Sequence, residues 1–370
     1  MIYNAPTKGE DGLYFVKALN DEKRKCFVQL NKVKVTDVSG EIVIDIVSEA
    51  NTKKVEGIIP SNHPNMRTEF AWMHALKAKH FSTSNILNVK GYNHVFVILP
   101  KGKLNLSAEG IKIGNQLNPA SSLFTSNIIG ELKKHNNKVH YVQEGPSWWF
   151  NDYEIIDQFN FYNSLTECDS IFAHNEHDSK FYKGLFPKKE VNVMPTLLIE
   201  DLIKEITPNP EEKVIIGGNF ARWYGGFQSY MVADEFEVNK WTQESHAKRE
   251  NEGSIDDLNH LPRIPWIEWM NTLSTFKYAV HLMPTVAAGT FSLNCAYFGI
   301  PCIGNEKVDT QRICHPDLAV DVDDVEKARI LARRLKEDKD FYGVCSETSK
   351  MMYQEIYTLD KYKEKLNKLL

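Results

Sequence analysis

The sequence has no CxxC cysteine pair, no apolar run near the roughly 20 residues that span a membrane, and no charged-then-apolar leader at its start. These absences exclude a disulfide-framework miniprotein and an integral membrane protein. The six cysteines are scattered, and several lie in apolar runs typical of buried thiols. We therefore expect a soluble protein of a reducing, cytoplasmic compartment that makes no contact with a membrane.

The sequence also has little net charge: it contains 44 basic and 49 acidic side chains, which gives a formal net charge of −5. The chain as a whole therefore gives no reason to expect a polyanionic partner. Residues 61–140 depart from this average, with ten Lys and Arg against three Glu. This segment is either an ordinary solvated face or a basic surface that faces the phosphates of a nucleic acid.

The apolar material is ample, since 42% of the 370 residues are hydrophobic and 11% are aromatic. A chain of this length predicts two domains of ordinary size. Apolar strands alternate with amphipathic helices in the first half: strands over 94–100, 138–145, 170–175 and 191–198, and helices over 70–79, 121–135, 153–168 and 177–185. This alternation predicts a parallel sheet covered by helices.

Two features interrupt the regular alternation. Ser39-Gly40 separates two β-rich runs, which predicts a β-hairpin insertion near the N-terminus. The charged stretch 200–212, with Pro208 and Pro210, is typical of a connection between domains. We expect an N-terminal Rossmann-like domain over 1–205, a C-terminal one over 206–345, and a C-terminal helix over 346–370 that could return to the N-terminal domain.

The second half repeats the α/β pattern, with strands over 213–218, 277–285 and 301–305 and helices over 229–236, 263–273 and 290–299. The tail from residue 325 onward is helical and charged. Between these elements, residues 237–260 are polar with few apolar anchors, which predicts a surface loop. Two Rossmann-like domains would place a ligand crevice at the carboxyl ends of their strands.

The segment VIIGGNFARWYGG carries the first chemical motif. A buried strand runs into Gly217-Gly218, which permit close approach of a backbone, and Asn219 and Arg222 offer donors suited to a diphosphate. The alternative is a plain tight turn with a surface arginine. In a second motif, small residues including Gly289 and Thr290 precede a helix, whose free N–H groups and dipole favour an anion.

The chain resembles the GT-B glycosyltransferases, most firmly over residues 283–304, where a small-residue turn, a helix and Gly299-Ile300-Pro301 follow one another. The resemblance implies a nucleotide-sugar donor held by the C-terminal domain. Many retaining members carry two glutamates eight positions apart here, and this sequence has Val286 and Asn294 instead. Asn294 is implied to bind the donor ribose, and the usual retaining arrangement is placed in doubt.

A closer resemblance is to phage DNA-modifying glycosyltransferases of the T-even phage β-glucosyltransferase type, through KVHYVQEGPSWWF, VIIGGNFARWYGG and RIPWIEW. It implies that Glu144 is the catalytic base. It also implies that Asn219 and Arg222 bind the diphosphate of a UDP-sugar, and that Arg263, Ile264 and Pro265 form the uracil loop. The acceptor implied is the 5-hydroxymethylcytosine of double-stranded phage DNA, modified in the host cytoplasm.

The residues themselves are compatible with these roles. Glu144 follows an apolar strand and could take the proton of an attacking hydroxyl, although it could equally cap a turn. Arg222 and the helix at Gly289 would stabilise the leaving diphosphate in place of a metal, since no aspartate-rich motif is present. We therefore expect no metal and no cofactor beyond the UDP-sugar co-substrate.

Acceptor contacts are predicted from three short segments. The turn with Lys8 and Gly9 resembles the first βα turn of a nucleotide-handling sheet. Trp148 and Trp149 could stack on a sugar or on an extruded base, or simply pack in a core. His174 and Asn175 follow a strand and could bind sugar hydroxyls, and a metal site formed by His174 and His177 lacks an evident third ligand.

The function predicted is transfer of a sugar from a nucleotide-sugar donor to a hydroxyl group, with hydroxymethylcytosine in DNA as the leading acceptor. A glycosyltransferase that acts on a surface glycan or glycolipid is the nearest alternative. A UDP-sugar epimerase needs no acceptor, and a periplasmic-type binding protein would perform no catalysis. The sequence leaves the sugar, the stereochemistry and the oligomeric state open.

Overall fold

The computed structural model describes residues 7–8, 14–15, 27–28, 33–38, 41–46, 68–76, 89–98, 106–107, 112–113, 116–117, 128–152, 155–221, 223–244 and 248–370. These residues form two compact units. Unit 1 takes in the described residues within 1–57 together with Trp72–Ala173 and Asp178–Val193. Unit 2 takes in the described residues within 58–71 together with His174–His177 and Met194–Leu370. The domain boundaries at 205 and 345 remain predictions.

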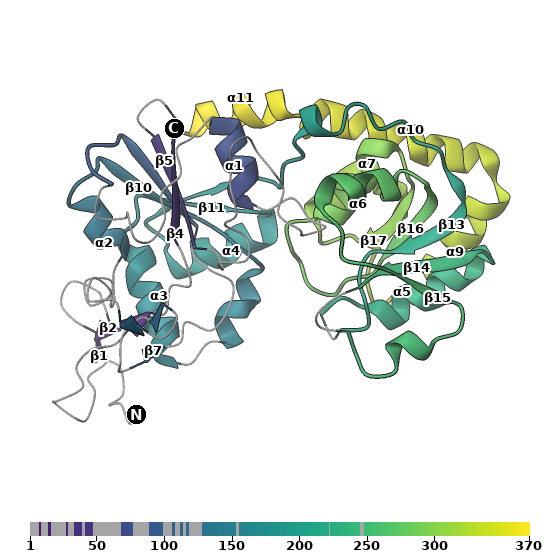
Figure 1. Ribbon diagram of the computed structural model, residues 1–370, viewed down its shortest axis with the longest axis horizontal. Coiled ribbons are helices and arrows are strands. Elements are labelled where there is room, and N and C mark those ends of the chain that lie inside the picture. Colours follow the sequence, from purple (N-terminus) through teal and green to yellow (C-terminus); the bar gives the residue numbers. More distant parts are fainter. Residues whose placement is uncertain are drawn as a thin grey trace. The chain divides into compact units, whose positions relative to one another are not determined.

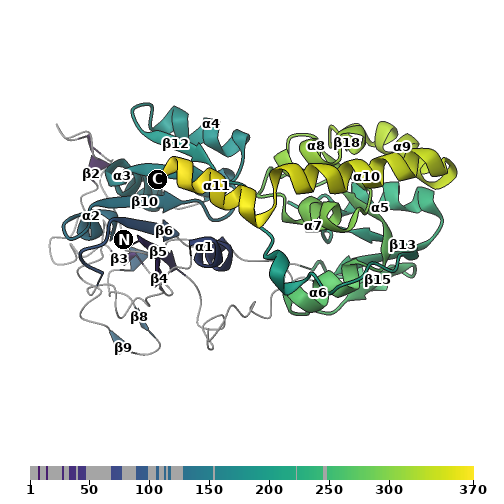
Figure 2. The same ribbon diagram turned by 90° about the horizontal axis from the view of Figure 1, so that it is seen from above.

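Unit 1 is built on a six-stranded sheet in the order β12-β11-β10-β6-β5-β4. Four of its parallel strands are β6 (His94–Ile98), β10 (Lys138–Val142), β11 (Ser170–Ala173) and β12 (Glu190–Val193). The neighbouring order of β10, β6, β5 and β4 can be followed in Figure 2. The sequence pattern predicted these four parallel strands, since each lies in a short run rich in apolar or β-branched residues that alternates with a helical segment.

Both faces of this sheet are covered. On one face, Val95, Val139 and Ile171 pack with side chains of α2 (Ile128–Lys133), α3 (Ile155–Glu167) and α4 (Glu176–Leu185). On the other, Trp72 of α1 (Thr68–Leu76) lies 5.2 Å from Phe96 and 5.2 Å from Phe172, measured between ring centroids. Alternate residues along a strand face opposite ways, which explains why every residue of β11 is buried.

At the edge of this sheet, β4 (Val33–Val38) and β5 (Glu41–Ile46) pair antiparallel, and β5 pairs parallel with β6. These strands flank Ser39-Gly40, and their status as an insertion stays a prediction. Three further antiparallel pairs are short: β1 (Thr7–Lys8) with β2 (Tyr14–Phe15), β3 (Phe27–Val28) with β7 (Leu106–Ser107), and β8 (Lys112–Ile113) with β9 (Gln116–Leu117).

Unit 2 contains a six-stranded, wholly parallel sheet in the order β15-β14-β13-β16-β17-β18, of which Figure 1 labels β13 to β17. Counted along the chain, this is the order 3-2-1-4-5-6 of a Rossmann sheet. The strands are β13 (Glu211–Ile216), β14 (Asn239–Gln243), β15 (Leu258–Leu261), β16 (Phe276–His281), β17 (Cys302–Asn305) and β18 (Ala319–Val320).

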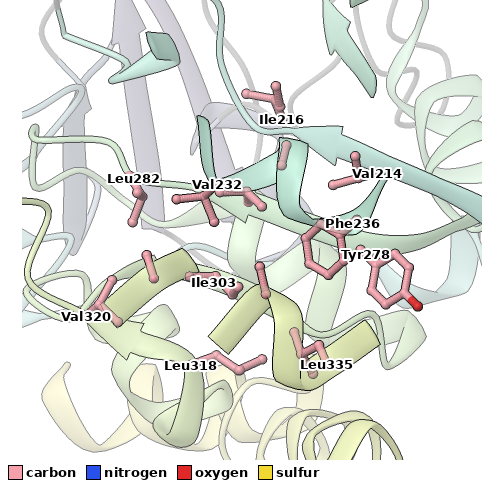
Figure 3. Close-up of a cluster of buried hydrophobic side chains, with 14 of the residues drawn as sticks. Val214, Ile216, Val232, Phe236, Tyr278, Leu282, Ile303, Leu318, Val320 and Leu335 are labelled. Carbon is pink, nitrogen blue, oxygen red and sulfur yellow. The ribbon is translucent and has the colours of Figure 1, made fainter. Parts of the chain in front are cut away.

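One face of the unit 2 sheet holds a core that Figure 3 shows in detail. Val214, Tyr278 and Ile303 point into it from the strands, and α5 (Gly226–Ala233) and α9 (Val325–Glu337) close it with Val232 and Leu335. The ring of Tyr278 stacks 4.2 Å from that of Phe236 in η7 (Asp234–Phe236), measured between centroids.

The remaining helices of unit 2 follow the sheet strands or extend the chain to its end. They are α6 (Trp266–Leu273), α7 (Thr290–Phe298), α8 (Asp309–Cys314), α10 (Lys339–Ile356) and α11 (Leu359–Leu369). The 3-10 turns are η5 (Ser147–Asp152), η6 (Glu200–Leu202), η8 (Glu252–Ser254) and η9 (Pro316–Leu318). None of the helices described here is both long and apolar enough to cross a membrane.

The prediction of a surface loop over 237–260 is wrong. This polar run contains two strands of the parallel sheet, β14 and β15, and the turn η8. β14 alternates between buried and more exposed residues, but its buried residues are Lys240 and Thr242, both polar. An apolar pattern therefore could not reveal the strand, because these polar groups are buried with hydrogen-bond partners.

Candidate functional site

Unit 2 has a topological switch point between β13 and β16. The chain leaves β13 toward β14 and β15 and then returns to place β16 on the other side of β13. Ligands of open α/β sheets bind outside the carboxyl ends of the strands at such a point. The two predicted donor motifs follow these two strands, and the Gly217 N–H donates to the Val280 carbonyl across them (2.9 Å). The fold therefore brings both motifs to the switch point.

The Gly217-Gly218 turn is tight because aromatic rings occupy the space beside it. A Cβ on Gly217 would lie 2.6 Å from Cγ of His281 and 2.8 Å from Phe291, and one on Gly218 would lie 2.7 Å from Cβ of Tyr224. The sequence predicted that these glycines allow a ligand to approach the protein backbone closely. The structure shows that the protein's own rings lie on the side where a Cβ would point, so a glycine is needed at both positions for packing, and a role of Gly217 and Gly218 in donor binding stays a prediction.

Asn219 is 1% exposed and is held in place by its side-chain oxygen, which accepts the Ala221 N–H (3.2 Å). Its Nδ2 is buried and has no hydrogen-bond partner within the described part of the chain. A buried amide that still has its two N–H donors to satisfy is suited to an oxygen-rich ligand such as a diphosphate. Arg222, the other predicted diphosphate ligand, lies outside the described residues.

The N-terminus of α7 is surrounded by hydroxyl groups. Gly289, the residue before the helix, has a φ of +77°, and its carbonyl accepts hydrogen bonds from Ser292 (3.1 Å) and Thr310 (2.8 Å). The Thr290 hydroxyl lies 3.3 Å from that of Thr196. The N-cap residue Gly289 gives no side-chain hydrogen bond to the helix, so among the described residues no N-cap side chain occupies the N–H groups of the first turn, which suit an anion.

The predicted acceptor residue Asn175 meets the same loop. Asn175 is 1% exposed, and its Nδ2 donates to the carbonyl of Ala287, two residues before Gly289 (3.1 Å). The next residue, Glu176, donates its N–H to the Asp309 carboxylate (2.9 Å). His174 is 6% exposed. Asn175 therefore contacts the loop that leads into α7, and a role of Asn175 and His174 in acceptor binding stays a prediction.

The other predicted donor residues lie on two elements of unit 2. Asn294 is fully buried in α7, and neither polar atom of its side chain has a partner among the residues described. Arg263, Ile264 and Pro265 follow the carboxyl end of β15, and Pro265 precedes the first residue of α6. Because β15 is parallel to β13, this loop lies at the same edge of the sheet as the Gly217 turn.

Two histidines in this region are kept neutral by burial. Burial lowers the pKa of His281, whose Nε2 is buried, to about 4. Burial also lowers the pKa of His315 to about 4, and the hydrogen bond between its Nε2 and the Ser292 carbonyl (3.0 Å) acts in the opposite direction. Neutral imidazoles at neutral pH leave the positive potential of this edge to helix α7 and to basic side chains.

Glu144 belongs to unit 1, two residues beyond the end of β10. A network of buried side chains holds its loop. The Nε2 of Gln143 donates both to the Gly145 carbonyl (2.6 Å) and to Asp178 (2.6 Å), and the other oxygen of Asp178 accepts the Ser147 N–H (3.2 Å). Gln143 and Asp178 are fully buried. Glu144 thus follows β10 at the carboxyl edge of the sheet, in a loop held by these hydrogen bonds, and its role as a catalytic base stays a prediction.

The aromatic cluster after Glu144 consists of Trp148, Trp149 and Phe150, and the structure describes the side chains of Trp148 and Phe150. Phe150 packs against Phe161 and Phe181, at 5.4 and 6.2 Å between centroids, so this ring belongs to the core. Trp148 is half-buried in η5. For Trp149, in the same turn, and for Lys8, in β1, the structure describes the backbone alone, and Gly9 lies outside the described residues.

The basic segment is described in part, and four of its lysines lie at the opposite edge of the unit 1 sheet from Glu144. Lys90, Lys133, Lys134 and Lys138 precede or begin strands β6 and β10, at the amino edge of the unit 1 sheet, whereas Glu144 follows the carboxyl edge. Lys133 is also paired with Asp169 (3.0 Å). These four lysines therefore do not surround Glu144, and a basic surface formed by residues 61–140 stays a prediction.

Sequence reasoning missed Thr196, Thr310 and Glu252. The sequence could not reveal the roles of the Thr196 and Thr310 hydroxyls, because their hydrogen-bond partners Thr290 and Gly289 are distant in sequence. Glu252 lies in the polar segment 237–260, for which a surface loop was predicted. No group of three or more potential metal-ligating side chains occurs among the described residues, His174 and His177 included.

The sequence matches no family model and no curated protein. Solved structures do resemble it in fold. Trehalose-6-phosphate synthase OtsA is similar with a TM-score of 0.54 at 10% identity, over 82% of this chain and 77% of that one. The N-terminal domain of Candida albicans trehalose-6-phosphate phosphatase is similar with a TM-score of 0.53 at 10% identity, over 81% and 72%.

An alpha-glucosyltransferase solved with UDP-glucose and DNA containing an abasic site is similar with a TM-score of 0.53 at 12% identity, over 77% of this chain and 82% of that one. At such identities the likeness shows the fold. The predicted class, an α/β protein with the two Rossmann-like units of GT-B glycosyltransferases, is therefore confirmed. The resemblance seen in the sequence is confirmed at the level of the fold, and the roles of individual residues stay predictions.

Proposed function

We propose that this protein is a glycosyltransferase that moves a sugar from a UDP-sugar to a hydroxyl group. The observation that carries the proposal is the switch point of unit 2, where the Gly217 turn, the buried Asn219 amide and the start of α7 after Gly289 meet. This is the arrangement that binds a nucleotide diphosphate in Rossmann sheets. Similar folds solved with UDP or UDP-glucose support the choice of donor.

The proposed chemistry needs few groups from the chain. Glu144 takes the proton of the acceptor hydroxyl as its oxygen attacks the anomeric carbon of the donor sugar. Asn219, Arg222 and the N–H groups of α7 stabilise the negative charge on the departing UDP. Val286 is an apolar residue and 7% exposed, so it supplies no acid at the position where retaining relatives of the fold carry one.

For the acceptor we propose 5-hydroxymethylcytosine in double-stranded DNA. Support comes from the alpha-glucosyltransferase fold, which has also been solved with UDP and a DNA 13-mer containing an HMU base, and from the excess of basic residues in 61–140. The excess of basic residues is the weaker support, because four of these lysines lie at the amino edge of the unit 1 sheet, away from Glu144. A surface glycan or glycolipid is the alternative acceptor, and a UDP-sugar epimerase, acting without acceptor, is the alternative reaction.

The test is UDP release from a panel of UDP-sugars, with and without DNA that contains hydroxymethylcytosine. Release that depends on the modified DNA supports the whole proposal and identifies the sugar. UDP release that does not depend on DNA supports a glycosyltransferase but refutes hydroxymethylcytosine DNA as its acceptor. An isomerised sugar nucleotide without UDP release supports the epimerase, and failure to bind any nucleotide sugar refutes the proposal.

A further inference from the structure

Glu252 is a buried carboxylate within the polar segment of unit 2. Its side chain is 1% exposed, and the residue begins the turn η8. Burial of a carboxylate is unfavourable unless several donors satisfy it. Glu252 has three: Oε2 accepts the N–H groups of Phe220 (3.4 Å) and Arg249 (3.2 Å), and Oε1 lies 3.1 Å from Nε2 of His260.

These three donors come from different parts of the unit. Phe220 follows Asn219 in the loop after β13, which carries the proposed diphosphate ligands. His260 lies in β15, three residues before Arg263, so that it leads into the proposed uracil loop. Arg249 precedes η8 in the connection from β14. One carboxylate therefore joins the two donor-binding loops through a short connecting segment.

From these contacts we infer that Glu252 is a positioning residue for the nucleotide donor, an inference that rests on the proposed function. The carboxylate fixes the loop after β13 and the end of β15 relative to each other, and so sets the spacing between the groups that would bind the diphosphate and the base. Loss of the hydrogen-bond acceptor Oε2 of Glu252 would leave the buried N–H groups of Phe220 and Arg249 without a partner and would let both loops move. Displacements of about 1 Å in supporting groups can cost up to about a hundredfold in function.

Glu252→Gln is the informative substitution because it keeps the size of the side chain. The amide retains one oxygen, and its nitrogen donates and cannot accept, so the negative charge is lost and one of the three present contacts is lost unless His260 changes tautomer and accepts from the amide. Glu250→Gln is the matched control. It makes the same chemical change two residues earlier, on an exposed side chain in the same segment.

The experiment measures UDP affinity by calorimetry, thermal unfolding, and the kinetic constants for a UDP-sugar, for the wild type and both variants. We expect Glu252→Gln to raise the Kd of UDP and the donor KM by about tenfold or more, with a much smaller change in kcat. The Glu250→Gln control should match the wild type. Wild-type affinity in a folded Glu252→Gln variant would overturn the inference, and a wild type that does not bind UDP would refute the proposed function instead.

A second variant keeps the inference testable if Glu252→Gln does not fold. His260→Phe removes only the contact to β15 and leaves the two backbone donors of Glu252 in place. We expect it to weaken uridine binding more than pyrophosphate binding, because the loop after β15 would bind the base. If His260→Phe binds uridine and pyrophosphate each as tightly as the wild type does, the inference is contradicted.

Discussion

The imidazole of His281 lies directly against the Cα of Gly217, where a Cβ would come within 2.6 Å of the ring's Cγ. This contact joins the two strands at the switch point, because His281 ends β16 and Gly217 follows β13. The ring of Phe291 lies beside it, 4.9 Å from His281 between centroids and also against Gly217. The start of α7 is thereby tied to the Gly217 turn by packing.

We expect Gly217→Ala to lower the free energy of unfolding by about 1–3 kcal/mol, because the new methyl group has no space and the rings must move. Affinity for UDP should fall as well, since the turn and α7 shift together. Gly184→Ala is the control: a Cβ there, in the last turn of α4, meets nothing within 4 Å. That change should leave stability unchanged or raise it by less than about 1 kcal/mol. Urea unfolding measures both, and equal effects would contradict the prediction.

Glu144→Gln should reduce kcat for transfer by about a hundredfold to ten-thousandfold, the usual loss when a general base is removed. The Kd of UDP should not change, because the proposed donor ligands all belong to unit 2 while Glu144 belongs to unit 1. Glu205→Gln, on an exposed side chain, is the control. Normal turnover by Glu144→Gln would show that another group is the base.

Buried neutral histidines make stability depend on pH. Burial lowers the pKa of His315 to about 4, and burial together with His94 lowers that of His140 to about 3. Below the unfolded value of about 6.5 the unfolded chain binds protons that the folded protein does not. Stability should therefore fall as pH drops from about 6.5 toward these values, by up to about 1.4 kcal/mol per pH unit for each group.

Urea unfolding at pH 7 and at pH 5 measures this dependence. The His315→Gln variant should lose less stability between the two pH values than the wild type, since one of the protonating groups is gone. A change at the exposed His177 to Gln should leave the loss as it is in the wild type. Parallel losses in the wild type and in His315→Gln would show that His315 does not contribute.

Lys240 should be important for stability although it lies in a polar strand. Its side chain is 6% exposed, and its Nζ lies 2.8 Å from Asp234 and 2.7 Å from Asp257. Lys240→Met removes both ion pairs, and because the two carboxylates are half-exposed and stay hydrated, we expect a loss of about 1–3 kcal/mol. Lys368→Met, which breaks an exposed pair with Glu364, should cost under about 1 kcal/mol. A similar cost for both, in chemical denaturation, would contradict this difference.

Much of the fold was predictable because its signals are local. The apolar runs of β6, β10, β11 and β16 and the small-residue turn before α7 were recognised from neighbouring residues alone. Where the signal was not apolar, prediction failed. β14 buries Lys240 and Thr242, and such polar burial is stable only through partners such as Asp257 and the Gly218 carbonyl, which are not adjacent in sequence.

The sequence by itself determined the alternation of strands and helices, the glycine turn at 217–218 and the helix that begins at Thr290, because each depends on short-range periodicity and backbone freedom. The tertiary structure decided the order of the strands, and with it which turns meet at the switch point. It also decided that four lysines lie at the amino edge, away from Glu144, and that Glu252 joins two loops. Strand order and buried hydrogen bonds depend on pairing between distant segments, which no local pattern specifies.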